Sequence, residues 1–312
     1  MNQENRNRKQ EWAFWVMTLL FFGLAFVTAR QLILLSWDYK SHMVEVSELL
    51  DFQDRLLNPK AWLFQSKSVA QNKEQTAQAL TSAERSLKMA EQRGVLFALL
   101  SALFLLLSYV LNRGKPLLYH RMTISMALVA IGCLVIGILA PMLEISAFID
   151  DLNIPLEMDI LGMSISKDFF FEGRMFFYYQ NKSVVELIQI LLQERNYIVA
   201  YSIIGFSFLV PLLKLGATIL LVTVSPRSEN SLPARVVGAI GKWSMADVFV
   251  AAAFLSYLGF SNMNTGVQTE SHTLIGLYFF FSYVILSICS GYFCSSALKE
   301  SRKENSSNVN DD

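Results

Sequence analysis

The apolar residues of this chain are gathered in blocks, and this grouping constrains the fold more than any other feature. A helix needs about 20 residues to cross a hydrocarbon core. Six runs are long enough, and they lie near residues 12–35, 95–111, 124–148, 198–224, 245–260 and 274–298. A membrane β-barrel would instead show alternating segments of about ten residues. We therefore predict an all-α polytopic membrane protein with about six transmembrane helices, in keeping with a hydrophobic content of 53%.

Basic residues gather on one side of these runs. They precede the first run, separate the second from the third and the fourth from the fifth, and follow the sixth, at Arg6, Arg8, Lys9, Arg113, Lys115, Arg121, Arg227, Arg235, Lys242, Lys299, Arg302 and Lys303. The loop at residues 150–195 is acid-rich instead. The positive-inside rule then places both termini and the short basic loops in the cytoplasm. The net charge of zero gives no indication of nucleic-acid binding.

The first two runs are separated by a long loop with helical spacing of its apolar residues. We expect residues 12–111 to form a two-span hairpin with a periplasmic helical extension at about 38–93, turning near Asn58-Pro59. The alternative is a flexible linker, because residues 60–73 are weakly patterned. Residues 1–11 and 299–312 are expected to be cytoplasmic tails, the second of them disordered.

The second outside loop contains seven aromatic residues within residues 168–179, namely Phe169, Phe170, Phe171, Phe176, Phe177, Tyr178 and Tyr179. The simpler interpretation is an aromatic belt at the membrane–water interface. The sharper one is an outer lip that faces lipid or a partner. Residues 152–167 alternate loosely and predict short strands, and residues 183–195 predict a short amphipathic helix.

A lysine and an aspartate lie inside apolar runs. Charges there are costly and usually paired. Counting residues inward from the basic loops places Lys214 and Asp247 in one layer of the inner leaflet, and polar residues of the same layer complete a predicted cluster of Lys214, Ser244, Asp247, Ser287 and Ser290. One interpretation is a proton-responsive site, since burial shifts the pKa values of both groups toward neutrality. The other is a static ion pair that fixes helix register. Pro211, one turn before Lys214, favours either a hinge or a fixed kink.

Motifs for catalysis or metal binding are missing from the sequence. The three cysteines form no C-x-x-C pair, the three histidines lack ligand spacing, and no phosphate loop or nucleophile motif occurs. We therefore expect neither an enzyme, nor a metal site, nor a cofactor.

Two segments resemble the paraquat-inducible protein A family. They are Leu209-Val-Pro-Leu-Leu-Lys214 and Val237-Gly-Ala-Ile-Gly-Lys-Trp-Ser-Met-Ala-Asp-Val-Phe-Val250, the latter with Lys242 and Trp243 at its centre. The resemblance covers residues 121–298, a single four-span module. Family members typically carry two such modules and cysteine-rich zinc ribbons. Here the two-span hairpin stands in place of the other module.

The resemblance implies a protein of the bacterial inner membrane that takes part in phospholipid transport with an MCE-type periplasmic partner. It also implies that Lys214, Ser244 and Asp247 belong to a polar network that carries proton coupling, with Ser287 less securely aligned. Two alternatives stay open: a non-transporting anchor or assembly factor for a periplasmic partner, and a transporter of protons or small ions.

Overall fold

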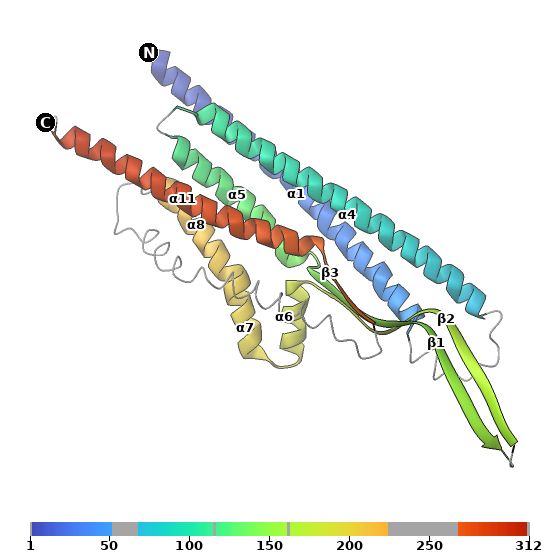
Figure 1. Ribbon diagram of the computed structural model, residues 1–312. Coiled ribbons are helices and arrows are strands. Elements are labelled where there is room, and N and C mark those ends of the chain that lie inside the picture. Colours follow the sequence, from blue (N-terminus) through green and yellow to red (C-terminus); the bar gives the residue numbers. More distant parts are fainter. Residues whose placement is uncertain (1, 52–67, 115–116, 161–162, 224–267, 311–312) are drawn as a thin grey trace.

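The computed structural model describes residues 2–51, 68–114, 117–160, 163–223 and 268–310. These residues form long helices and one small sheet (Figure 1). Five of the described helices are long and apolar enough to cross a membrane, namely Glu11–Leu49, Glu74–Asn112, Leu118–Leu139, Tyr197–Thr223 and Ile275–Glu300. The prediction of an all-α polytopic membrane protein is confirmed. The predicted run at 245–260 lies outside the described residues.

The first two helices form a long antiparallel pair. Helix α1 (Asn2–Leu49) and helix α4 (Ser68–Asn112) lie side by side along most of their length (Figure 1). The rings of Phe21 and Phe104 stack between them with centroids 4.2 Å apart. The 48 residues of α1 span roughly 72 Å, against about 30 Å for a hydrocarbon core. The pair must therefore project beyond the membrane.

Helices α5 (Leu118–Leu139) and α11 (Ile275–Asn310) form the centre of the remaining bundle. They approach closely at Gly137, where a Cβ atom would lie only 2.8 Å from the backbone nitrogen of Phe280. Leu134 and Ile136 of α5 and Tyr283 of α11 are fully buried and belong to the main hydrophobic core. Small residues thus let two helix backbones meet, as is common in membrane bundles.

One membrane helix is bent where its hydrogen-bonding pattern changes. It comprises α7 (Tyr197–Ile204), a π-helical turn η1 (Gly205–Leu209) and α8 (Val210–Thr223). The Val210 N–H donates to the Gly205 carbonyl, five residues back. This wider turn precedes Pro211, which has no N–H to donate. Helix α8 packs on α5 and α11, whereas α7 packs mainly on the short helix α6 (Val184–Gln193).

A three-stranded antiparallel sheet lies at one end of the bundle. Strand β1 (Leu143–Ile160) pairs with β2 (Met163–Lys182) on one side and with β3 (Gln268–Thr273) on the other. The strands expected within residues 152–167 are therefore parts of a much longer hairpin. The expected third span at 124–148 is wrong at its end, because α5 stops at Leu139. Pro141 disfavours helical geometry at the residue before it, and Ala140 is extended there with φ −79° and ψ 149°.

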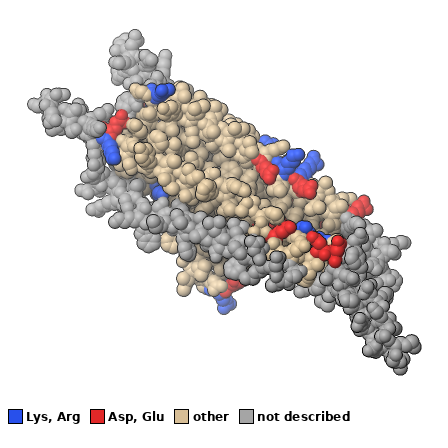
Figure 2. Space-filling model, in the orientation of Figure 1, with Lys and Arg blue, Asp and Glu red and all other residues tan. Residues whose placement is uncertain are grey.

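The sheet packs against the end of the long helical pair. Val46 of α1 and Ala79 of α4 form a buried cluster with Phe148 and Phe176, whose rings meet edge to face with centroids 6.0 Å apart. The Phe176 N–H also donates to the Leu50 carbonyl at 3.0 Å. On the face seen in Figure 2, charged side chains are few along the broad centre and gather toward the ends. This distribution is typical of a protein embedded in a bilayer.

Candidate functional site in the membrane helices and at the sheet

Of the predicted pair Lys214 and Asp247, the structure describes Lys214. It lies half-buried in α8, one turn after the buried Pro211. Its carbonyl accepts a hydrogen bond from the Thr218 hydroxyl at 2.8 Å. Thr218 is itself 3% exposed, so this face of α8 turns into the protein. The predicted partners Ser244 and Asp247, with the motif residues Lys242 and Trp243, lie outside the described residues, and their pairing with Lys214 stays a prediction.

The two predicted serines of α11 are both buried against neighbouring helices. Ser290 is 1% exposed, and its hydroxyl donates to the Thr123 carbonyl of α5 at 3.3 Å. Ser287 is 2% exposed, and its hydroxyl has no hydrogen-bond partner among the described residues. A buried hydroxyl without a partner is costly. These serines therefore give the interior of the bundle a polar character in the part that the structure describes.

The aromatic cluster of residues 168–179 divides between interior and surface. All seven residues lie on β2. Phe176 is 5% exposed and packs under the sheet, so the prediction of an outward-facing lip is wrong for this residue. Phe177 and Tyr178 are exposed, and Tyr179 packs against Phe176. The simple alternation of a strand is interrupted here, because the pairing with β1 shifts register between Ala147 and Phe148 and leaves Phe177 without a partner. The side chains of Phe169, Phe170 and Phe171 lie outside the described part.

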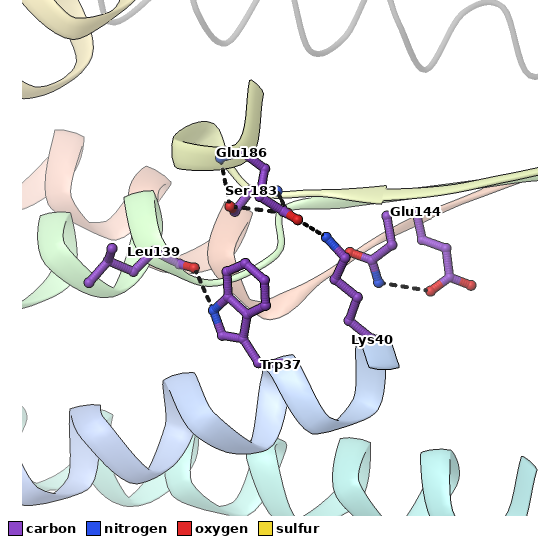
Figure 3. Close-up of polar contacts among 7 residues, drawn as sticks. Trp37, Lys40, Leu139, Glu144, Ser183 and Glu186 are labelled. Atoms are coloured by element: carbon purple, nitrogen blue, oxygen red, sulfur yellow. Dashed lines mark hydrogen bonds and ion pairs between the residues drawn. The ribbon is translucent and has the colours of Figure 1, made fainter. Parts of the chain in front are cut away.

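A buried ion pair joins the long helical pair to the rest of the protein. Lys40 of α1 contacts the Glu186 carboxylate of α6, and the two side chains are only 11% and 15% exposed (Figure 3). Glu186 also closes a capping box, in which it accepts from the Ser183 N–H at 3.0 Å and donates its own N–H to the Ser183 hydroxyl at 3.3 Å. The Glu186 carboxylate thus caps the N-terminus of α6 and also forms the ion pair with Lys40 of α1.

At the same junction, a tryptophan of α1 forms a hydrogen bond with α5. The Trp37 indole N–H donates to the Leu139 carbonyl at 3.2 Å, at the last residue of α5 (Figure 3). The Lys40 ammonium lies 5.0 Å from the centre of the Trp37 ring, a cation–π distance. The bond to Leu139 occupies a carbonyl that the end of a helix leaves without an internal partner.

Next to the ion pair, the Glu144 carboxylate of β1 is 5% exposed. It accepts a hydrogen bond from the Tyr39 hydroxyl at 2.7 Å and a longer one from the Asn181 amide at 3.5 Å. Burial raises the pKa of Tyr179 well above its usual range, and the nearby Glu144 carboxylate raises it further. Tyr179 therefore stays a neutral phenol beside Glu144.

A buried polar contact also joins the C-terminal end of α4 to the N-terminal end of α5. The Arg121 guanidinium, 9% exposed, donates to the Asn112 side-chain oxygen at 2.6 Å and lies 5.2 Å from the Phe14 ring. One turn further into the bundle, the hydroxyls of Ser108 and Ser125 are 2.8 Å apart. Interhelical hydrogen bonds of this kind help membrane helices to associate.

The sequence predicted the serines of α11 and missed the junction residues. Lys40, Glu144 and Glu186 lie in three elements that are distant along the chain, and pattern alone does not pair them. The Ser183-x-x-Glu186 spacing is the one available signal, because it is the signature of a capping box. Within the described residues, no group of three or more histidine, cysteine, aspartate or glutamate side chains could hold a metal ion.

Five long apolar helices with buried polar groups between them define a polytopic helical membrane protein. Residues 170–298 match the model of the paraquat-inducible protein A family, which confirms the predicted resemblance for that part of the chain. The match begins within β2 and includes α6, α7, α8 and most of α11, whereas α1 and α4 precede it. Among curated proteins and among solved structures, no significant match to the chain is found.

Proposed function

We propose that this protein takes part in phospholipid transport between the membranes of a bacterial envelope, together with an MCE-type periplasmic partner. In this proposal it lies in the inner membrane with both termini cytoplasmic. The observation that carries the proposal is the family match over the helices that contain Lys214, Ser287 and Ser290. The arrangement of the chain supports it, because both termini lie at one end and the sheet lies toward the other (Figure 1).

The proposal assigns Lys214 and Asp247 to coupling between proton binding and a change in conformation. Intramembrane charges are costly and are usually kept for function. The bend at η1 supports this assignment, because it ends about one and a half turns before Lys214 and separates α7 from the packed helix α8. A change in the charge of Lys214 would then alter how α8 packs on α5 and α11. Because α7 packs mainly on α6, these two short helices would move together relative to α8.

The test is the rate at which newly made phospholipid, labelled in a pulse, reaches the outer membrane in a strain that lacks this protein. We expect wild type to restore the rate and Lys214→Ala and Asp247→Asn to fail, although both variants insert normally. Lys88→Ala, which removes an exposed lysine of α4, is the matched control and should restore the rate fully. Full restoration by the Lys214 and Asp247 variants would contradict the coupling role.

A second candidate is an anchor or assembly factor that transports nothing itself. The observation that favours it is the buried cluster of Val46, Ala79, Phe148 and Phe176, which holds the helical extension and the sheet as one platform. In that case, shortening α1 and α4 together by two turns beyond Trp37 would abolish function, and the Lys214 variant would be mild. A third candidate, a proton transporter, predicts proton flux in liposomes without a lipid partner.

A further inference from the structure

A pocket of about 470 Å³ lies where the long helical pair meets the sheet and the start of α11. Its walls come from α1, α4, β1, β3 and the first turn of α11, and its lining is mainly apolar, with Leu87 and Ile275 among the lining residues. The volume falls in the range of small-molecule sites. Since α1 and α4 precede the region of the family match, the pocket belongs to the junction that this chain builds between the two parts.

The pocket contains a buried carboxylate that no cation pairs with in the part of the chain that the structure describes. Glu144 lines it and is 5% exposed, and its recorded hydrogen bonds come from two neutral donors, Tyr39 and Asn181. None of the ion pairs among the described residues includes Glu144, and Lys40 nearby is paired with Glu186 instead. A buried carboxylate is normally paired. The pocket therefore offers a place for an external cation.

Two further carboxylates and two tyrosines shape the same pocket. Glu84 and Glu91 of α4 also line it, and they are seven residues apart and so on one helix face. Tyr39 and Tyr278 also line it, and the faces of aromatic rings attract ammonium groups. Of its lining residues, His272 lies 3.5 Å from Glu270, so that imidazole is directed to another carboxylate.

The position of the pocket favours an amphiphile over a soluble ion. Ile275 and Tyr278 are in the first turn of a helix long and apolar enough to cross the membrane, which places the pocket at the membrane surface. Tyr278 and Phe281 of α11 are more than half exposed. The carboxylates of the pocket could bind an ammonium group, while the exposed apolar side chains of α11 could contact a hydrocarbon chain of the same molecule.

We propose that this acidic pocket binds the ammonium group of a phospholipid headgroup, with phosphatidylethanolamine as its typical ligand. Three carboxylates would repel a headgroup that carries only negative charge, so phosphatidylglycerol should be excluded. The proposal names the lipid class for the transport proposed above and rests on that function for its biological use, whereas the binding itself is tested separately.

The experiment is native mass spectrometry of the full chain in mild detergent after exchange with equimolar phosphatidylethanolamine and phosphatidylglycerol of identical acyl chains. We expect wild type to retain phosphatidylethanolamine about tenfold over phosphatidylglycerol, the ratio that one well-placed charged contact provides. Glu144→Gln should abolish this preference, because glutamine keeps an acceptor oxygen for the Tyr39 hydroxyl and removes the negative charge. Glu48→Gln, which neutralises an exposed carboxylate of α1 outside the pocket, should leave the preference unchanged.

A second variant covers the case in which Glu144→Gln fails to fold. Leu87→Trp fills the pocket and keeps every carboxylate, so it should also remove the bound lipid. Competition with soluble ethanolamine separates the two sources of an ammonium group: displacement of lipid at equal concentration would overturn the lipid assignment, and resistance supports it. Equal retention of both lipids by wild type, or an unchanged preference in both pocket variants, would overturn the proposal. A failure of transport in the labelling assay would leave this binding result standing.

Discussion

The ion pair between Lys40 and Glu186 is the contact through which a single carboxylate connects α1 to the start of α6. Glu186→Ala should lower the stability of the folded protein by about 3 kcal/mol or more, because it leaves the Lys40 ammonium buried and unpaired. Loss of the capping box at Ser183 should add about 1 kcal/mol. The measurement is the midpoint of thermal unfolding in detergent, which should fall by several degrees.

Glu45→Ala is the control for this prediction. Glu45 also faces a potential cation, His42 at 3.8 Å, but its side chain is 59% exposed. Exposed pairs contribute little, so this change should alter stability by less than about 0.5 kcal/mol. The double change Lys40→Met with Glu186→Ala should recover part of the loss, since it removes the unpaired charge. Equal effects of Glu45→Ala and Glu186→Ala would contradict the structural role of the buried pair.

Tyr179 gives a prediction about alkaline pH. Burial raises its pKa in the folded protein above the ordinary value of about 10. The folded state therefore keeps a proton that the unfolded state releases, and stability falls as the pH rises above about 10, with the full contribution present below it. Tyr179→Phe should weaken this loss. Unfolding followed between pH 8 and pH 11 by intrinsic fluorescence checks the difference, and identical pH profiles would show that Tyr179 has no such role.

Close packing of α5 on α11 depends on the lack of a side chain at Gly137. Gly137→Ala would place a Cβ atom 2.8–2.9 Å from Phe280 backbone atoms, and backbone cannot move aside as a flexible side chain can. We expect the two helices to separate and the unfolding midpoint to fall. Gly291→Ala on α11 is the matched control, since its Cβ would meet nothing within 4 Å. A larger loss at Gly291 than at Gly137 would contradict this packing.

The sequence predicted the helices of this protein better than it predicted the sheet. Length and apolar content were enough for the helices, because a membrane span is a property of some 20 consecutive residues. The amphipathic pattern of residues 183–195 predicted α6, whereas the capping-box spacing of Ser183 and Glu186 was not used. The hairpin of β1 and β2 was underestimated, since its pairing joins residues such as Glu144 and Asn181 that only a folded sheet brings together. Alternation within residues 152–167 gave only a local signal.

The candidate site was also predicted only in part from the sequence. Ser287 and Ser290 could be chosen because polar residues stand out in an apolar run, and both are buried. The partners of Glu144 and Lys40 could not be predicted, because they lie in other elements. Contacts between α1, β1 and α6 depend on how these elements pack, and the spacing of residues within one segment carries no information about that packing. The carboxylates of the pocket likewise come from different elements.

The arrangement of the chain predicts which parts share one side of the membrane. Asp151 lies in β1 and Glu45 near the end of α1. Arg113 directly follows α4, whose C-terminal end lies away from the sheet (Figure 1). Single cysteines at these positions, in a variant without Cys133, Cys289 and Cys294, should react differently with a membrane-impermeant maleimide. We expect Asp151→Cys and Glu45→Cys to be labelled in intact cells with a permeable outer membrane, and Arg113→Cys only after lysis. Labelling of all three before lysis would contradict the topology.

The antiparallel pair of α1 and α4 has a consequence for how this protein can change in length over evolution. Trp37 fixes α1 at the level where α5 ends, and the 12 residues from Asp38 to Leu49 rise about 18 Å beyond it. That rise sets the height of the Val46–Ala79–Phe148–Phe176 cluster, and thus of the sheet above the bilayer. An insertion of seven residues in one helix would move its half of the cluster by about 10 Å and leave the other half in place. Insertions and deletions in relatives that share this junction should therefore come in matched pairs, one in each helix, and a relative with a thicker envelope to cross should carry longer copies of both helices.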